Sequence, residues 1–529
     1  MAEITLSPSF DASIGDGFLK TPLGLNATLQ VVQDKDGTNS VLYLSTQDLT
    51  ARGGGNVGTN TAFGGSALIA NTTGQGNTAY GQVALYTNTT GSFNSAIGNG
   101  ALFTNLSGSK NTAVGNAALF YNSTGYENTA LGGSALLNNT DGYDNVSVGY
   151  RSSYSNQNGF KVVSIGAYAN ELNVTGTGIT AVGFQALQNT TNSNNTAVGV
   201  YASRLTTTGT YNVGLGNSAL ELNTTGSNNT ALGAAALYNN TASNNTAVGY
   251  YALNANVSGT ETTAVGYQAL LNSTASSNTA VGYQSLTANT TGQQNTSVGR
   301  GSLTTNTLGA SNTAVGFNAL LLNLSGNNNT ALGWQALRNN TANSNTAIGY
   351  AAGNSNTSGS IVAVGLEALN ANTTGTGLTA VGYQALRAST GNNNTAIGYQ
   401  AGLAITTGNS NLAVGATSLF TSTTGSFNTA VGMYTLSYNN ANNNTALGFA
   451  ALYNSTGSSN TSIGHNSLYN TTSSQNTAVG ASAGTANTSG TIVAVGFEAL
   501  TTNTTGTGGT AVGYQALKAS TGNSNTAIG

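Results

Sequence analysis

The sequence has no cysteine in its 529 residues, which excludes disulfide bonds and thiolate metal sites. Charge is also scarce, because 11 Lys and Arg and 14 Asp and Glu make up only 5% of the chain, where soluble globular proteins carry about 25%. The formal net charge of -3 gives no basic field for nucleic acid or an anionic membrane. No apolar run approaches the ~18 residues of a transmembrane helix. We therefore expect no nucleic-acid partner and no membrane insertion.

Proline occurs only twice, and glycine, although it fills 72 positions, is not placed at every third residue as collagen requires. The N-terminal residues Met1–Pro8 lack the basic and apolar segments of a Sec signal peptide. We expect a chain that is made without such an export signal. The low charge also separates this chain from disordered chains, which are usually rich in charge and proline.

One phrase is abundant: Asn-Thr-Ala-Val-Gly, two variable residues, Ala-Leu, and a polar stretch such as Asn-Thr-Thr-Gly. It begins at Asn60, and its glycine recurs every 16 or 17 residues from Gly64 to Gly529, in 28 steps that average about 16.6 residues. Length changes fall only in the polar stretch, as where Thr224–Ser227 is answered by the shorter Thr241–Ser243. The polar stretch is therefore expected to be a turn.

A longer copy is also present in the chain. The segment Ile361–Gly398 reappears almost verbatim as Ile492–Gly529, 131 residues further on. Tolerance of copied blocks indicates selection for length and surface, not for one unique site.

A period of 16–17 residues is too short for helix-pair repeats and shorter than leucine-rich repeats. It suits a coil with Asn-Thr-Ala-Val as one strand, a glycine corner, the residues around Ala-Leu as a second strand or a single helical turn, and the polar stretch as a second corner. Residues 60–529 are therefore predicted to be all-β, a parallel β-solenoid (β-roll) of about 28 coils. Coils ~4.8 Å apart would make a rod on the order of 130 Å long, with Asn, Thr, Ala and Val in axial ladders.

The N-terminal segment differs from the repeats. Residues 1–52 hold both prolines and nine of the charged residues, and we predict a small separate β-rich module there. Ala27–Gln33 and Ser40–Ser45 have strand character and flank Asp34–Gly37, which predicts a hairpin with an Asp-Gly turn. Residues 53–59 are rich in glycine and are predicted to be a linker.

The pattern within the strands points beyond a single chain. Ala and Val are neighbours, as are Ala and Leu, and neighbours in a strand face opposite sides. A coil this small encloses a thin core, so small apolar groups would form a long exposed stripe on a monomer. Burial against sister chains around a threefold axis predicts an intertwined or side-by-side homotrimer. A monomeric rod with a solvated Ala stripe remains the alternative.

The repeat resembles known proteins. Asn278–Leu286, with the sequence Asn-Thr-Ala-Val-Gly-Tyr-Gln-Ser-Leu, resembles repeats of bacteriophage tail fibres and of fibres of other large DNA viruses. It is similar, less closely, to the Ser-Val-Ala-Ile-Gly head repeats of trimeric autotransporter adhesins, which are trimeric left-handed parallel β-rolls. The resemblance covers about residues 60–529. Those adhesins have a shorter repeat, an export signal and a membrane anchor, so the departures favour the viral fibres.

The resemblance implies a structural fibre shaft on a virion that projects a host-adhesion tip towards a host surface glycan or protein. The N-terminal module would then attach the fibre to a virion protein. A bacterial cell-surface adhesin or extracellular filament is the alternative. A minor alternative is an ice-binding solenoid, because one Thr per strand recurs in nearly every coil.

Reactive chemistry is sparse, and we expect no enzyme, catalytic residue, cofactor or metal site. The only histidine, His465, follows Gly464 where other repeats have Tyr, Phe or Ala, and it lacks metal-ligand partners. Asp34–Gly37 resembles the start of a calcium loop, but Ser45 stands where the bidentate Glu is needed. The acidic residues of the repeats are scattered over different coils: Glu127, Asp141, Asp144, Glu171, Glu221, Glu261, Glu367 and Glu498.

Two surface features stay open at this level. Asn-x-Ser/Thr sequons such as Asn71–Thr73 are expected to be ladder and turn residues, with sugar attachment as the alternative. Aromatic residues that follow the repeat glycine are expected to stack in a discontinuous row, which would pack at a corner or chain interface, with glycan stacking as the alternative. This row comprises Tyr250, Tyr267, Tyr283, Phe317, Trp334, Tyr350, Tyr383 and Tyr399.

Overall fold

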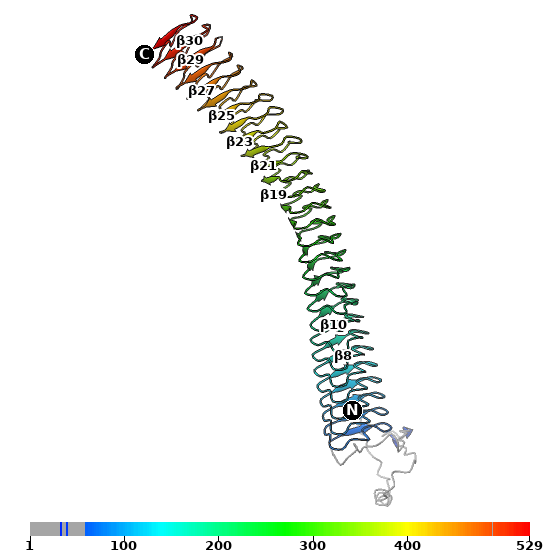
Figure 1. Cartoon of the computed structure of the whole chain (residues 1–529). Helices are drawn as coiled ribbons and strands as arrows, with labels where there is room; N and C mark the ends of the chain where they lie inside the picture. The colour runs from blue at the N-terminus through cyan, green and yellow to red at the C-terminus, as the bar shows by residue number, and fades with distance from the viewer. Residues whose placement is uncertain (1–31, 34–38, 41–58, 489) are drawn as a thin grey trace, which may run out of the picture. The chain divides into compact units, whose positions relative to one another are not determined.

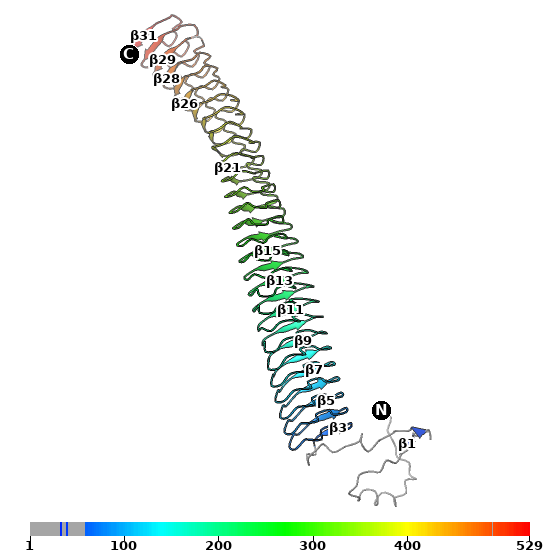
Figure 2. The same ribbon diagram turned by 45° about the vertical axis from the view of Figure 1, so that its right-hand side comes forward.

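The computed structural model describes residues 32–33, 39–40, 59–488 and 490–529. Every regular element in these residues is a β-strand. The chain divides into two compact units, Met1–Ser243 and Asn244–Gly529. In each unit, short strands lie one above another in successive coils (Figures 1 and 2).

The strands of the first unit are β1 (Val32–Gln33), β2 (Asn39–Ser40), β3 (Thr61–Phe63), β4 (Thr78–Tyr80), β5 (Ser95–Ile97), β6 (Thr112–Val114), β7 (Thr129–Leu131), β8 (Val146–Val148), β9 (Val163–Ile165), β10 (Thr180–Val182), β11 (Thr196–Val198), β12 (Val213–Leu215) and β13 (Thr230–Leu232).

The strands of the second unit are β14 (Thr246–Val248), β15 (Thr263–Val265), β16 (Thr279–Val281), β17 (Thr296–Val298), β18 (Thr313–Val315), β19 (Thr330–Leu332), β20 (Thr346–Ile348), β21 (Ile361–Val364), β22 (Leu378–Val381), β23 (Thr395–Ile397), β24 (Leu412–Val414), β25 (Thr429–Val431), β26 (Thr445–Leu447), β27 (Thr461–Ile463), β28 (Thr477–Val479), β29 (Ile492–Val495), β30 (Gly509–Val512) and β31 (Thr526–Ile528).

Successive strands within each unit pair in parallel and in register. Between β10 and β11, Thr180 lies beside Thr196, Ala181 beside Ala197 and Val182 beside Val198. The second unit repeats this arrangement, for example between β22 and β23. Each residue therefore lies beside its counterpart one repeat away, which confirms the predicted parallel β-solenoid with a coil of 16–17 residues.

The strands β1 and β2 pair antiparallel, with Val32 opposite Ser40. This pairing agrees with the predicted hairpin, although each strand has only two residues. The predicted turn at 34–37 lies outside the described residues.

The predicted second strand of each coil is wrong. After Gly183, the chain forms a turn in which Gln185 and Leu187 have left-handed backbones, with φ of 55° and 49°. The N–H of Gln185 donates to the O of Ala167 in the preceding coil (3.1 Å), and that of Leu187 donates to the O of Ala202 in the following coil (2.9 Å). Left-handed residues that alternate with residues of negative φ bend the chain tightly while its polar groups still point along the stack. This segment therefore bonds to its neighbours without being a strand.

The interior of each coil is lined by alanine and leucine. Ala181 at the middle of β10 is fully buried, as are Ala186 and Leu187 of the turn segment. The flanking strand residues Thr180 and Val182 face outward and are half-buried. The prediction of an exposed alanine stripe is therefore wrong, because the turn segment folds back over the inner side of the strand and covers its alanines.

Two asparagine ladders run inside the first unit. In the corner ladder, Nδ2 of Asn105 donates to Oδ1 of Asn88 at 2.6 Å, and Nδ2 of Asn88 donates to Oδ1 of Asn71 at 2.8 Å. In the strand ladder, the backbone N–H of Asn94 donates to Oδ1 of Asn77 at 2.9 Å. The carbonyl of Gly91 accepts the amides of both Asn77 (2.9 Å) and Asn88 (3.0 Å). The predicted axial Asn ladders are confirmed, and they satisfy buried polar groups that would otherwise be costly.

The repeat glycine is required by contact between coils. Gly183 has φ of +133°, and a Cβ at this position would lie 2.4 Å from the carbonyl oxygen of Gly199 in the next coil. Gly199 has the same relation to Gly216. Only glycine combines this backbone conformation with such close stacking, which explains why the glycine sets the period.

We expect Gly183→Ala to destabilise its coil by about 2–4 kcal/mol, because the methyl group meets a backbone carbonyl and the φ is strained. The matched control is Gly65→Ala, since a Cβ at Gly65 has no neighbour within 4 Å. Hydrogen–deuterium exchange should accelerate around residues 180–199 in the first variant only. Equal exchange in the two variants would contradict this explanation.

Some coils of the second unit exchange two core residues together. Gly353 stands where most coils have Leu, and Ile361 stands where most have Asn. A Cβ on Gly353 would lie 2.8 Å from Cδ1 of Ile361 and 3.0 Å from Cδ2 of Leu337, so Ile361 fills the space of the missing leucine. Gly484 and Ile492 repeat this exchange with the same 2.8 Å separation. The core is thus filled from either side of the coil.

A double-mutant cycle tests this compensation. Gly353→Leu should overpack the core, Ile361→Asn should leave a cavity, and each should cost about 1–3 kcal/mol. The double variant rebuilds the common coil, so it should be more stable than the sum of the single effects by about 1 kcal/mol or more. Denaturant unfolding followed by local hydrogen exchange measures each term, and strictly additive effects would refute the pairing.

Candidate interaction surface

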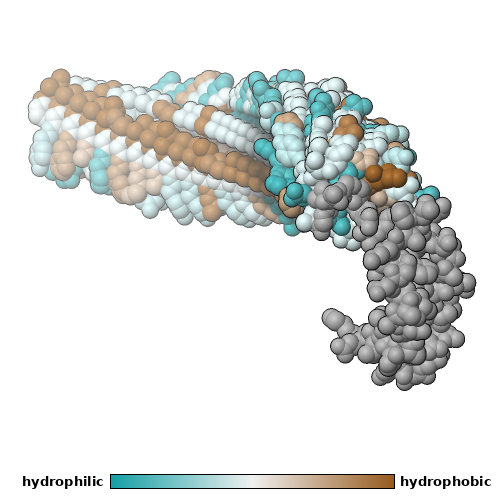
Figure 3. Space-filling model, turned by 90° about the horizontal axis from the view of Figure 1, so that it is seen from below, coloured by the Kyte–Doolittle hydropathy of each residue, from teal (hydrophilic) through white to brown (hydrophobic). Residues whose placement is uncertain are grey.

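The exposed side of each strand carries an outer apolar stripe, defined as the third strand residue and the residue after the repeat glycine. In the second unit, every third strand residue is Val, Leu or Ile. Leu332, Trp334 and Tyr350 show the exposure of the stripe, at 47%, 39% and 47%. Apolar residues form continuous rows along the stacked coils, beside paler polar rows (Figure 3).

The second row of the stripe is mostly aromatic in the second unit. It comprises Tyr250, Tyr267, Tyr283, Arg300, Phe317, Trp334, Tyr350, Leu366, Tyr383, Tyr399, Ala416, Met433, Phe449, His465, Ala481, Phe497 and Tyr514. Neighbouring rings stack nearly parallel, as Trp334 on Tyr350 with centroids 4.6 Å apart and Tyr383 on Tyr399 at 5.1 Å. The predicted discontinuous aromatic row is confirmed.

Ring stacking decides what the row presents to its surroundings. Tyr267 lies between Tyr250 at 5.6 Å and Tyr283 at 5.1 Å, so both of its faces are covered. A sugar that binds by stacking needs a free ring face, and only ring edges point outward here. The row is therefore better suited to packing against another protein surface than to glycan stacking.

The first unit distributes its rings differently. Its first five coils have Gly65, Gln82, Asn99, Asn116 and Gly133 after the repeat glycine. Its rings stack instead in two other rows, Tyr86–Phe103–Phe120 on the turn segment and Tyr126–Tyr143–Phe160 on the polar corner. The aromatic part of the stripe is thus mainly a property of the second unit.

The stripe of the second unit has almost no charge. Its one charged residue, Arg300, lies between the rings of Tyr283 (5.6 Å) and Phe317 (5.7 Å) in cation–π geometry. His465 stacks on Phe449 with centroids 5.2 Å apart, so it takes the place of a ring in the row. No group of three or more His, Asp and Glu among the described residues is placed to hold a metal ion. The histidine is exposed, as the sequence predicted.

The scattered acids mostly pair with cations of neighbouring coils. Glu171 and Glu221 are only 6% and 7% exposed. Arg151 lies 3.0 Å from Glu171, and Arg204 lies 2.8 Å from Glu221. Gln188 also donates to Glu171 at 2.8 Å. Sequence reasoning missed this burial, although a cation one repeat from each acid was the available signal.

The exposed acids form weaker pairs on the polar corner. Lys110 and Glu127 are 2.7 Å apart, and this hydrogen bond lowers the pKa of Glu127 and raises that of Lys110. Asp144 follows Glu127 in the same row one repeat later, and Thr140 donates to Asp141 at 3.2 Å. These contacts fit a solvated corner.

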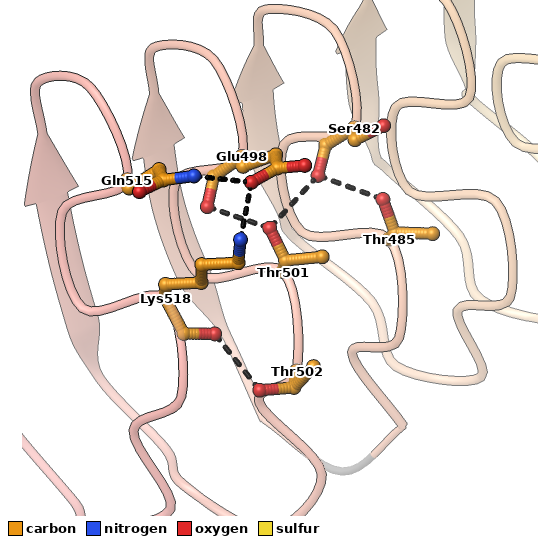
Figure 4. A network of polar contacts seen from close by, with 7 residues as sticks. All are labelled: Ser482, Thr485, Glu498, Thr501, Thr502, Gln515 and Lys518. Atoms are coloured by element: carbon orange, nitrogen blue, oxygen red, sulfur yellow. Dashed lines mark hydrogen bonds and ion pairs between the residues drawn. The ribbon is translucent and has the colours of Figure 1, made fainter.

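Glu367 and Glu498 have equivalent contacts in the two copied blocks. Glu498 accepts from Nζ of Lys518 at 2.5 Å and from Nε2 of Gln515 at 2.7 Å (Figure 4). The hydrogen bond from Lys518 lowers the pKa of Glu498. Glu367 accepts from Gln384 at 2.8 Å in the same way. Both carboxylates therefore end a short amide ladder and have a structural role in the stack.

The sequon asparagines of the corner ladder are buried. Asn71 is 3% exposed, and its Nδ2 donates to the O of Gly74 at 3.1 Å. A glycan on this nitrogen would remove the side chain from the ladder. The ladder interpretation is therefore favoured at Asn71.

The search of protein-family models and the search of curated proteins each found no match to this chain. Within the described residues, no helix exists that is long and apolar enough to cross a membrane.

The buried ion pairs can be compared with an exposed one. We expect Arg151→Ala to destabilise its coils by roughly 2 kcal/mol, because Glu171 stays buried with a single partner and the Arg151 head group is only about one-third exposed. Lys110→Ala removes a pair whose side chains are 63% and 43% exposed, and we expect little change. Local hydrogen exchange measures both effects, and a larger effect for Lys110→Ala would contradict the assignment.

Proposed function

We propose that this chain is the structural shaft of a viral, phage-like tail or capsid fibre that projects a host-adhesion tip. The observation that supports it best is the repetition of one coil type, with its apolar stripe, through each unit. Such repetition makes length and a linear surface, which a fibre needs. The resemblance of Asn278–Leu286 to viral fibre repeats points the same way. In this proposal the chain belongs to the virion, and the segment 1–52 attaches it to a virion protein.

The partner that we propose for the outer apolar stripe is two further copies of the same chain. A fully buried ring covers about 150–250 Å². Ten rings of the row in the second unit are 39–70% exposed, which leaves on the order of 1,000 Å² of ring surface. Soluble monomers rarely expose more than about 600 Å² in one apolar patch. A parallel copy repeats with the same spacing, so it matches the stripe coil by coil, and the resemblance to trimeric β-rolls favours three chains.

The mass in solution tests this assembly. Light scattering should give about three times the chain mass of 52.6 kDa. The triple variant Tyr267→Lys, Trp334→Lys and Tyr399→Lys should lower the mass, because like charges would meet along the interface. A control variant with the same added charge on the exposed polar corner, Gln293→Lys, Thr424→Lys and Gln475→Lys, should keep the mass of the unmodified protein.

The single tryptophan gives a second readout of the same prediction. Emission from Trp334 should be blue-shifted in the assembled protein and in the corner control, because the interface excludes water. A single-chain mass for the unmodified protein, or an unchanged mass for the stripe variant, would refute the assembly. Immunogold labelling of virus particles with an antibody to the repeat tests the location, and unlabelled fibres would refute it.

Two other functions have some support. A cell-surface adhesin or extracellular filament would use the same shaft, and neighbouring secretion genes instead of tail genes would favour it. An ice-binding solenoid would use the in-register threonines of the strand face, such as Thr279, Thr296 and Thr313. That face has one threonine row beside an aliphatic row, and absence of thermal hysteresis at millimolar protein would exclude this function.

A further inference from the structure

The inner polar ladders are interrupted in one part of the second unit. In the coil before the interruption, Nδ2 of Asn411 donates to the O of Gly425 at 2.8 Å, as in other complete coils. The next three coils each have 16 residues. At the corner-ladder position, where most coils have Asn, the chain has Ser422, Asn439, Ser455 and Thr471. The ladder therefore loses carboxamide groups within a few coils.

Five buried donors lie together at this interruption. Among residues 59–488 and 490–529, Nδ2 of Asn439, Asn444 and Asn460 and the hydroxyls of Ser422 and Ser455 have no hydrogen-bond partner. All five side chains are at most 1% exposed. A buried polar group without a partner is costly, so this concentration indicates a missing ligand.

The orientation of the three amides is set by their oxygens. Oδ1 of Asn439 accepts the N–H of Ala441 at 2.7 Å, and Oδ1 of Asn444 accepts the N–H of Asn460 at 2.9 Å. Oδ1 of Asn460 accepts the N–H of Asn476 at 2.9 Å and its Nδ2 at 2.8 Å. Turning an amide over would break these bonds. The NH₂ groups are therefore the ends that lack a partner.

Serine also leaves space in the ladder. A serine side chain has two fewer heavy atoms than asparagine, a difference of about the ~30 Å³ that one water molecule occupies in the liquid. Ser455 makes this change between Asn439 and Thr471, in the coil that begins at Asn444. Nδ2 of Asn460 lies beside the same corner, 3.0 Å from where a Cβ on Gly457 would be.

The donor set selects the ligand. Amide NH₂ groups offer only hydrogens, so the ligand must accept hydrogen bonds. An anion would be buried without a countercharge, because no Lys or Arg occurs between Arg387 and Lys518. Water accepts from the amides and can donate to the oxygen of Ser455. We propose that the corner formed by Asn444, Ser455 and Asn460 is a binding site for a buried structural water molecule.

A density map of the intact protein at about 2 Å resolution tests the site. It should contain a peak within hydrogen-bonding distance of Nδ2 of Asn444, Nδ2 of Asn460 and Oγ of Ser455. The variant Ser455→Asn should lose this peak, because its carboxamide fills the space. A map with no peak, in which the amides turn to protein carbonyls, would overturn the proposal. Replacement of the peak by an anomalous bromide signal in bromide buffer would show an anion instead and would also overturn it.

Hydrogen exchange gives an independent readout. Ser455→Asn should slow the exchange of amides in residues 444–475 by about threefold or more, since it supplies protein partners to the buried groups. Ser455→Ala keeps the space but removes the hydroxyl, so it should speed the same exchange. The matched control is Ser273→Asn, at a ladder serine whose oxygen already accepts from Asn289 at 3.1 Å. Slower exchange in that control, or faster exchange in Ser455→Asn, would contradict the site.

Discussion

Hydrogen bonding between equivalent positions of successive coils is the constraint on which the rest of this structure depends. The strands satisfy it in register, the turn segments satisfy it with alternating backbone handedness, and the asparagines satisfy it through side-chain amides. Because every coil must bond to the coils beside it, a residue that suits one coil tends to suit all of them. The near-identical repeats follow from this requirement.

The same constraint explains where the sequence is free to vary. Gly183 and its counterparts cannot change, since a carbonyl of the next coil occupies the space of a side chain. The core tolerates exchange when a second residue compensates, as Ile361 does for Gly353. The polar corner tolerates the loss of one residue per coil, but the interruption near Ser455 shows a local cost, because buried amides there lose their protein partners. Variation therefore concentrates where the axial bonding can be repaired.

A solenoid of this kind leaves function to its outer surface. Buried carboxylates such as Glu171 and ladder ends such as Glu498 have partners within the stack. The outer apolar stripe has none within its own chain, and its rings present their edges outward. The proposal of a self-associating fibre shaft rests on that stripe, whereas host attachment rests on the resemblance alone.

The sequence by itself determined the period, the glycine corner, the turn in the polar stretch and the axial Asn ladders. These are local or strictly repeated features, so spacing and residue type are enough to predict them. Only the tertiary structure decided that Ala186 and Leu187 lie in a turn and not in a second strand, because tight backbone reversal depends on bonds to Ala202 and other residues of neighbouring coils. That reversal places Ala181 inside the coil and leaves the aliphatic and aromatic rows outside. Which apolar residues are exposed is therefore set by how the coil closes on itself, and alternation along the strand could not reveal it.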